Sequence, residues 1–176
     1  MQRIFHLALT LFALFCMAGQ PVTMAQESKK PAHKAGSAKS SSKKPVTNAF
    51  TPDSIQYGPA PAFLPPGAQL AVLEGNPMGT GEYTIRIKAP DGYKIAPHWH
   101  PRRENVTVVE GTIKVGMGDK FDESKMMSFP TGSFAFLDPS MHHYAMMSGE
   151  TTVQIHGTGP VKFNYINPAD DPSKKK

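Results

Sequence analysis

The sequence predicts an all-β domain, built as a barrel or a sandwich, with appended segments at both ends. Two observations favour this class. From residue 68 onward, apolar and polar residues alternate in short runs, and no apolar pattern keeps a helical period for long. Residues that form turns, mainly Gly, Pro and Asp, separate those runs at short intervals. Short half-buried strands joined by frequent turns are typical of β-sandwiches and barrels.

Residues 1–25 have the pattern of a secretory signal peptide. Met1-Gln2-Arg3 is a short basic start, and Ile4–Ala18 is almost unbroken apolar sequence. This stretch is too short to span a bilayer comfortably, but it has the length of a signal-peptide core. We expect cleavage after Ala25, no stable membrane insertion, and a periplasmic or secreted location in a bacterium. Cleavage after Ala18 and an uncleaved anchor are the alternatives.

Residues 26–50 are rich in Lys, Ser, Ala and Pro, which predicts a disordered basic linker. A Pro-rich lead-in follows at 51–67, then the barrel at 68–168 and a charged tail at 169–176. The formal net charge of the chain is +5, and its location argues against a nucleic-acid partner. The linker holds six Lys and one Glu, whereas residues 51–168 hold nine basic and eleven acidic residues. Because the single cysteine, Cys16, would leave with the signal, no disulfide is expected.

Four alternating runs supply the clearest strands. Their apolar members are Tyr83, Ile85 and Ile87; Val106 and Val108; Ile113 and Val115; and Val153 and Ile155. Turns are expected between such runs, at Pro90-Asp91-Gly92, Glu110-Gly111, Gly118-Asp119, Pro130-Thr131-Gly132 and Ser148-Gly149.

The stretch "PHWHPRRENVTVVEG", residues 97–111, carries the chemistry. Residues two apart on a strand point to the same side, so His98 and His100 project together. A tight turn would let Glu104 begin the next strand beside them. Two imidazoles and a carboxylate suit a divalent metal, and "DPSMHHYAM" offers His142 or His143 as a further ligand. A lone histidine on a strand is more often structural, but here several ligand types occur together.

These residues resemble the cupin superfamily, whose first motif is G(X)5HXH(X)3-4E(X)6G. The match consists of Gly92, His98, His100, Glu104 and Gly111, with every spacing satisfied. The second motif, G(X)5PXG(X)2H(X)3N, is degenerate here. Gly132 and His143 match, while Asp138, Ser140 and Met147 replace the proline, the second glycine and the asparagine.

The resemblance implies a conserved β-barrel, or jelly roll, of the small bacterial single-domain type. It assigns His98, His100, Glu104 and His143 as the ligands of one divalent transition metal: Fe, Mn, Zn, Ni or Cu. His142 would then lie in the surroundings of the site or at the surface.

Members of the superfamily include dioxygenases, isomerases and sensing domains, so the fold does not fix the reaction. We expect an exported metal-dependent enzyme acting on a small oxygen-rich molecule, with a dioxygenase-like oxidation as the first hypothesis. A non-catalytic module that binds a metal or a small ligand, akin to the sensing cupin domains of some anti-sigma factors, is the alternative. Barrels of this kind can also form homodimers. The candidate pocket residues are Arg86, Tyr144, Gln154 and His156.

Overall fold

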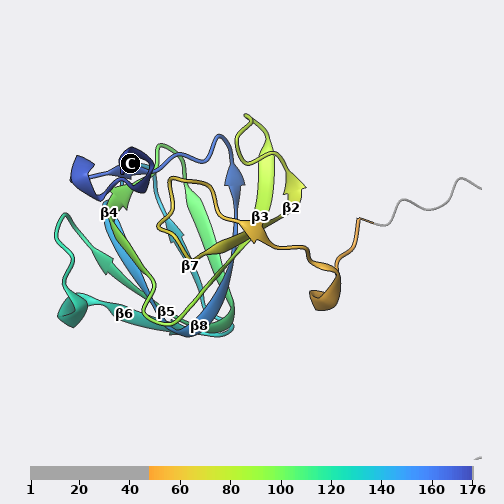
Figure 1. Cartoon of the computed structure of the whole chain (residues 1–176), viewed down its shortest axis with the longest axis horizontal. Helices are drawn as coiled ribbons and strands as arrows, with labels where there is room; N and C mark the ends of the chain where they lie inside the picture. The colour runs from red at the N-terminus through yellow and green to blue at the C-terminus, as the bar shows by residue number, and fades with distance from the viewer. Residues whose placement is uncertain (1–47, 176) are drawn as a thin grey trace, which may run out of the picture. The chain divides into compact units, whose positions relative to one another are not determined.

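The computed structural model describes residues 48–175. The expected signal peptide, Cys16 and residues 26–47 of the expected linker lie outside the described residues. Nine strands make up most of the fold (Figure 1). They are β1 (Gly58–Pro59), β2 (Gln69–Gly75), β3 (Glu82–Ala89), β4 (Lys94–Trp99), β5 (Glu104–Met117), β6 (Met127–Pro130), β7 (Phe134–Leu137), β8 (His143–Thr158) and β9 (Asn164–Tyr165).

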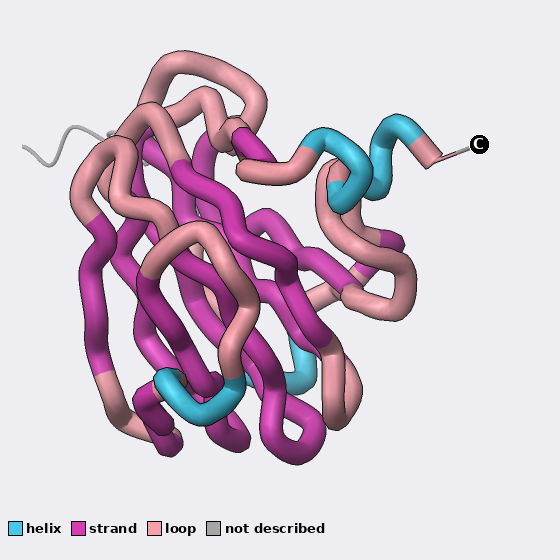
Figure 2. The backbone as a smooth tube through the Cα atoms, turned by 90° about the vertical axis from the view of Figure 1, so that its left-hand side faces the viewer, coloured by secondary structure: helices cyan, strands magenta, loops and turns pink. Residues whose placement is uncertain are grey.

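Helix in this part of the chain is limited to four single 3-10 turns, which lie outside the sheet (Figure 2). They are η1 (Pro52–Ser54), η2 (Glu123–Lys125), η3 (Pro168–Asp170) and η4 (Pro172–Lys174). The all-β class predicted from the alternating sequence is confirmed, and the architecture is that of a jelly roll.

The strand β8 is the centre of the sheet, and all its pairings are antiparallel. Its C-terminal half pairs with β3, from Thr151 to Thr158, and its N-terminal half pairs with β4, from His143 to Met146. The other edge of β8 pairs with β5 along nearly its whole length. On its own far edge, β5 pairs with β7 at one end and with β6 at the other.

Two expected turns are instead bends inside these long strands. Gly111 lies within β5 at a φ of 76°, and Gly149 lies within β8 at a φ of 75°. The register of β5 against β8 shifts on both sides of Glu110. A glycine at positive φ inserts a bulge, which turns a strand without ending its pairing. The prediction of turns at Glu110-Gly111 and Ser148-Gly149 was therefore wrong, and the two strands fold the sheet over on itself.

The core lies where the alternation predicted it. On β3, Tyr83, Ile85 and Ile87 are buried, whereas the residues between them are half-buried on the other face. The same alternation buries Val153 and Ile155 of β8, which pair directly with Ile87 and Ile85. Side chains that pair across two strands share a face, so these residues form one apolar layer.

The proline-rich lead-in packs against the barrel. Leu64 is 3% exposed and belongs to the core. The hydroxyls of Tyr93 and Tyr165 donate to the carbonyls of Pro65 and Phe63, both at 2.7 Å. A buried hydroxyl needs such a partner, so these bonds hold the lead-in in place.

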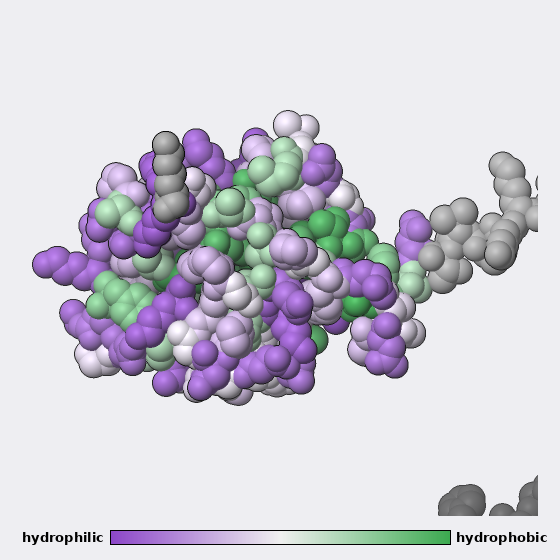
Figure 3. Space-filling view, viewed as in Figure 1, coloured by the Kyte–Doolittle hydropathy of each residue, from purple (hydrophilic) through white to green (hydrophobic). Residues whose placement is uncertain are grey.

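Hydrophilic side chains cover most of the face seen in Figure 3, and apolar ones form smaller groups between them. Within residues 48–175, no helix is long and apolar enough to cross a membrane.

The two motif glycines differ in what a side chain would meet. A Cβ at Gly111 would lie 2.4 Å from the Glu150 carbonyl oxygen, whereas a Cβ at Gly92 would meet nothing within 4 Å. Both have positive φ. We expect Gly111→Ala to lower the free energy of unfolding by about 3 kcal/mol, from backbone strain and overpacking together. Gly92→Ala should cost only the strain, about 1–2 kcal/mol. Urea unfolding measures both, and equal losses would contradict the close approach of β5 to β8.

Candidate metal centre

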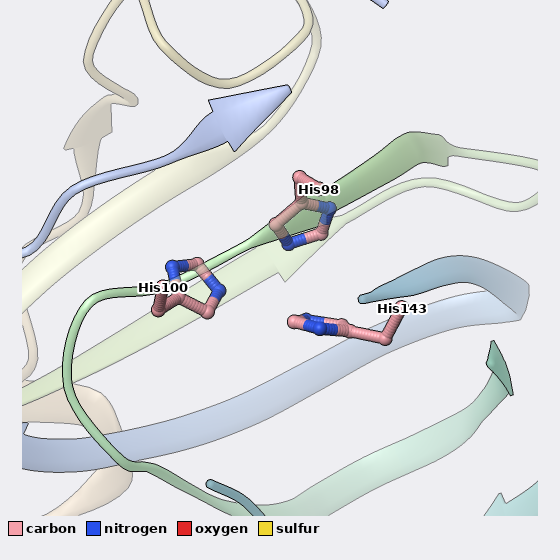
Figure 4. A group of neighbouring side chains, drawn as sticks. All are labelled: His98, His100 and His143. Carbon is pink, nitrogen blue, oxygen red and sulfur yellow. The ribbon is translucent and has the colours of Figure 1, made fainter. Parts of the chain in front are cut away.

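Three buried histidines converge inside one end of the barrel (Figure 4). His98 belongs to β4, His100 follows that strand directly, and His143 begins β8. His98 and His143 are register partners, so their side chains leave neighbouring strands on the same face. One ring nitrogen of each residue lies within 4.8 Å of the others. The three histidines that the resemblance grouped together are therefore neighbours, although His98 and His143 are 45 residues apart in the sequence.

Each imidazole is held by a backbone carbonyl through Nδ1. The partners are Ala96 for His98 at 2.7 Å, Lys162 for His100 at 2.9 Å and Met141 for His143 at 3.0 Å. A carbonyl only accepts hydrogen bonds, so each Nδ1 carries a proton, and Nε2 is the nitrogen left to bind a metal. This arrangement orients metal-binding histidines in proteins generally.

Glu104 completes the group from a different strand. Its Oε2 lies 3.5 Å from Nε2 of His100 and 3.8 Å from Nε2 of His143. The expectation that it stands beside the histidines through continued pairing was only half right. Among the described strands, β4 pairs with β8 and β9 but not with β5. Residues 101–103 connect β4 to β5, and Glu104 approaches His100 and His143 from the first position of β5.

The charge states of the imidazoles suit a metal. Burial lowers the pKa of His98 well below 6.5, and the neighbouring His143 and His100 add to the effect. Burial also lowers the pKa of His143, although the charge of Glu104 opposes it. Both rings are therefore neutral near pH 7, which is the form that binds metals.

One buried atom has no partner without a metal. Nε2 of His100 is the buried side-chain nitrogen or oxygen within residues 48–175 that makes no hydrogen bond. Such atoms are rare in folded proteins, and each calls for an explanation. Three imidazole nitrogens with a carboxylate oxygen nearby form a donor set for a borderline divalent cation. The residues present therefore fit a metal.

The degenerate second motif still presents His143 to the site. Asp138, in place of the family proline, accepts hydrogen bonds from Nε and Nη2 of Arg103 at 2.8 and 2.6 Å. The same guanidinium lies over the ring of Phe136, 4.5 Å from its centre. The backbone N–H of Ser140 donates to the carbonyl of His100 at 2.9 Å. These contacts tie the second-motif loop to the first motif, and His143 lies beside His98 and His100.

His142 lies away from the three rings. Its Nδ1 pairs with a carboxylate oxygen of Asp119, and its side chain is 39% exposed. It occupies the surface position that the sequence offered as one option.

A cavity of about 270 Å³ opens beside the histidines. Apart from His98, Glu104, Ser133 and His143, all the residues that line it are apolar. Eight large apolar residues of the described chain are exposed, and five of them line this cavity. They are Met117, Met127, Phe134, Phe136 and Met141. Apolar exposure concentrated at one opening is typical of a ligand site rather than of scattered surface residues.

The candidate pocket residues chosen from the sequence lie elsewhere. Arg86 donates from Nε to Oε1 of Gln154 at 3.1 Å, on the face of the sheet opposite the buried isoleucines. His156 is exposed on the same outer face. Tyr144 is fully buried, and its hydroxyl donates to the carbonyl of Asp122. None of the four lines the cavity, because the apolar members of the alternating pairs take the inside.

The residues missed were the methionines and phenylalanines of the opening. For the two phenylalanines, the signal in the sequence is the apolar run "SFAFL" at 133–137, where Phe134 and Phe136 alternate with Ala135 and Leu137. Both faces of this edge strand are apolar, which is unusual for a strand with one side exposed.

The family model for the ChrR cupin-like domain matches residues 49–162. The chain belongs to this cupin family. The match includes the lead-in, in agreement with its packing on the barrel. No curated protein sequence matches this cupin.

Solved structures share its fold at low sequence identity. The polyketide cyclase RemF from Streptomyces resistomycificus superposes with a TM-score of 0.60 at 11% identity, covering 73% of this chain and 92% of that one. An RmlC-like cupin protein from Ralstonia eutropha superposes with a TM-score of 0.50 at 17% identity, covering 63% and 68%. These likenesses concern the fold.

Ser140 provides a test of the second-motif loop. It is the non-glycine residue with positive φ in the described chain, at 66°, where the family has glycine. We expect Ser140→Gly to raise the free energy of unfolding by about 0.5–1 kcal/mol, because relief of left-handed strain exceeds the entropic cost of glycine. Ser148→Gly, in β8, should lower it by a similar amount. Urea unfolding compares the two, and a loss in both variants would contradict strain at Ser140.

Proposed function

We propose that this cupin is an exported, metal-dependent enzyme that acts on a small and mainly apolar molecule carrying an oxygen donor. The observation that carries the proposal is the position of the histidine cluster at the wall of the apolar cavity. His98 and His143 belong to the cluster and line the cavity, and Glu104, which lies near His100 and His143, lines the cavity as well. The oxygen-rich substrate expected from the sequence fits this lining less well, since most of its oxygens would lose their hydration without gaining partners.

His98, His100 and His143 would hold the metal, and Glu104 is the nearest candidate for a fourth ligand. Iron, manganese, zinc, nickel and copper all accept such a donor set. When bound, the metal supplies a Lewis acid for an oxygen donor, and iron adds reactivity toward dioxygen, as the dioxygenase-like hypothesis requires.

The chain itself would supply the surroundings of the reaction. The apolar walls exclude water from a bound molecule and leave its polar end facing the histidines. Glu104 is the carboxylate that lines the cavity, so it is the group placed to accept a proton from that end. The similarity to a protein named as a polyketide cyclase, at 11% identity, supports the fold alone.

Export rests on the sequence of residues 1–25, with their basic start, apolar core and small residues before the cleavage position. The slightly acidic barrel supports a small-molecule ligand rather than nucleic acid.

A second candidate is a non-catalytic module that binds the metal and a small ligand. The family match favours it, because its description names a domain and no reaction. Dioxygen uptake by the metal-loaded protein with an apolar phenol separates the two. Uptake coupled to conversion of the phenol supports the enzyme, and recovery of the phenol unchanged supports the binding module.

Metal content tests the centre directly. The wild type, purified from its native compartment, should contain about one equivalent of a divalent transition metal. His100→Ala and His143→Ala should lose it, because each removes one of three nitrogen ligands. His142→Ala is the matched control and should retain it, since this neighbouring side chain pairs with Asp119. Elemental analysis measures the content. Wild type that takes up none of the five metals would refute the centre.

The apolar cavity predicts which molecules bind. Naphthol, a fused ring with one hydroxyl, should bind, and glucose should not, because the lining offers few polar partners. Ala135→Phe should abolish naphthol binding by filling the cavity that Ala135 lines. Ala169→Phe, at an exposed position, is the control and should bind normally. Titration calorimetry measures all four combinations, and preferential binding of glucose would contradict the apolar substrate.

A further inference from the structure

A second and much smaller pocket also borders this centre. It is lined by Tyr83, His100, Glu104, residues 101–103 and residues near Lys162. Its volume is about 10 Å³, which is room for a single water. Glu104 lines both this pocket and the apolar cavity, whereas Tyr83 and His100 line only the small one. The centre therefore has an apolar side and a polar side, with the carboxylate between them.

Tyr83 differs from the other buried tyrosines. The hydroxyls of Tyr93, Tyr144 and Tyr165 each donate to a backbone carbonyl. The hydroxyl of Tyr83, a residue only 6% exposed, makes no hydrogen bond to the described part of the chain. Its oxygen is not among the fully enclosed side-chain atoms without a partner, so the hydroxyl reaches solvent, and the small pocket that Tyr83 lines is where a water would be its partner.

The surroundings of Tyr83 keep its hydroxyl at the pocket as a donor. A Cβ at Gly157 would lie 3.4 Å from this hydroxyl and 3.0 Å from the carbonyl oxygen of Arg103, so the bare glycine backbone makes room for the ring end. Burial, together with the charges of Glu104 and Glu82, raises the pKa of Tyr83 to about 12. The phenol is therefore protonated at any ordinary pH, and it lies close enough to Glu104 for the charge of that carboxylate to contribute to the shift.

We propose that Tyr83 is a positioning residue, and that it holds the carboxylate of Glu104 through one water bound in the small polar pocket. The hydroxyl donates to the water, and the water donates to a carboxylate oxygen. The other carboxylate oxygen remains directed at His100 and His143. The proposal deepens the proposed metal centre, since it states what orients the one acidic group there. In this proposal the small polar pocket holds the water, and the apolar cavity remains free for the substrate.

Crystal structures of the full chain, wild type and Tyr83→Phe, test the geometry without regard to metal. In the wild type we expect one ordered water within hydrogen-bonding distance of both the Tyr83 hydroxyl and the Glu104 carboxylate. In Tyr83→Phe the water should be lost or the carboxylate should turn. A direct bond between hydroxyl and carboxylate, a wild-type pocket without water, or a Glu104 unchanged in the variant would each overturn the proposal.

Cobalt binding tests the consequence. Tyr83→Phe should weaken the affinity for Co²⁺ by about 10-fold, the usual effect of removing a group that orients a ligand, and should change the visible spectrum of the bound ion. In a Glu104→Gln background, the same substitution should have no further effect. Tyr93→Phe is the matched control: it loses a buried hydrogen bond and should lower the Tm, but leave affinity and spectrum unchanged.

Equal spectra in wild type and Tyr83→Phe, or independent effects of Tyr83→Phe and Glu104→Gln, would refute the role of Tyr83. If the wild type binds no cobalt, the metal centre itself fails, and the two crystal structures then decide the proposal alone.

Discussion

The pairing of β5 with β8 is the constraint on which the rest of the structure depends. It runs from Asn105 opposite His156 to Met117 opposite His143. It survives the bends at Gly111 and Gly149, because each glycine takes a backbone conformation that a side chain would strain. The strands β6 and β7 pair with opposite halves of β5, and residues of both line the cavity. The same pairing fixes both ends of the site, since β5 begins with Glu104 and β8 begins with His143.

The sequence was informative where spacing alone carries the geometry. His98 and His100 had to share a face, and the alternation of Tyr83, Ile85 and Ile87 had to give a buried layer. The bend at Gly111 was not predictable, because a glycine at positive φ serves equally well in a turn and in a bulge. Nor does alternation say which face turns inward when both carry plausible groups. Arg86 and Gln154 lie on the outer face because burying a charge or an amide is unfavourable, whereas burying the isoleucines is favourable.

The position of Glu104 was predicted for a reason that proved incomplete. A hairpin would have placed it beside His98 and His100 on one sheet, where it could approach them only from the flank. The connection at 101–103 instead places it at the start of β5, which does not pair with β4, and there it lines both the apolar cavity and the small polar pocket. Long-range pairing decides such a position, and a local spacing rule contains no information about it.

The exchange of proline for aspartate in the second motif changes the kind of force that holds the loop before His143. A proline ring stiffens the backbone by covalent geometry, which no solvent condition alters. The pair of Arg103 with Asp138 is about half exposed and electrostatic, so dissolved ions screen it. The stiffness of this loop therefore depends in part on the surrounding salt concentration. For a protein proposed to work outside the cytoplasm, the cell does not hold that concentration constant.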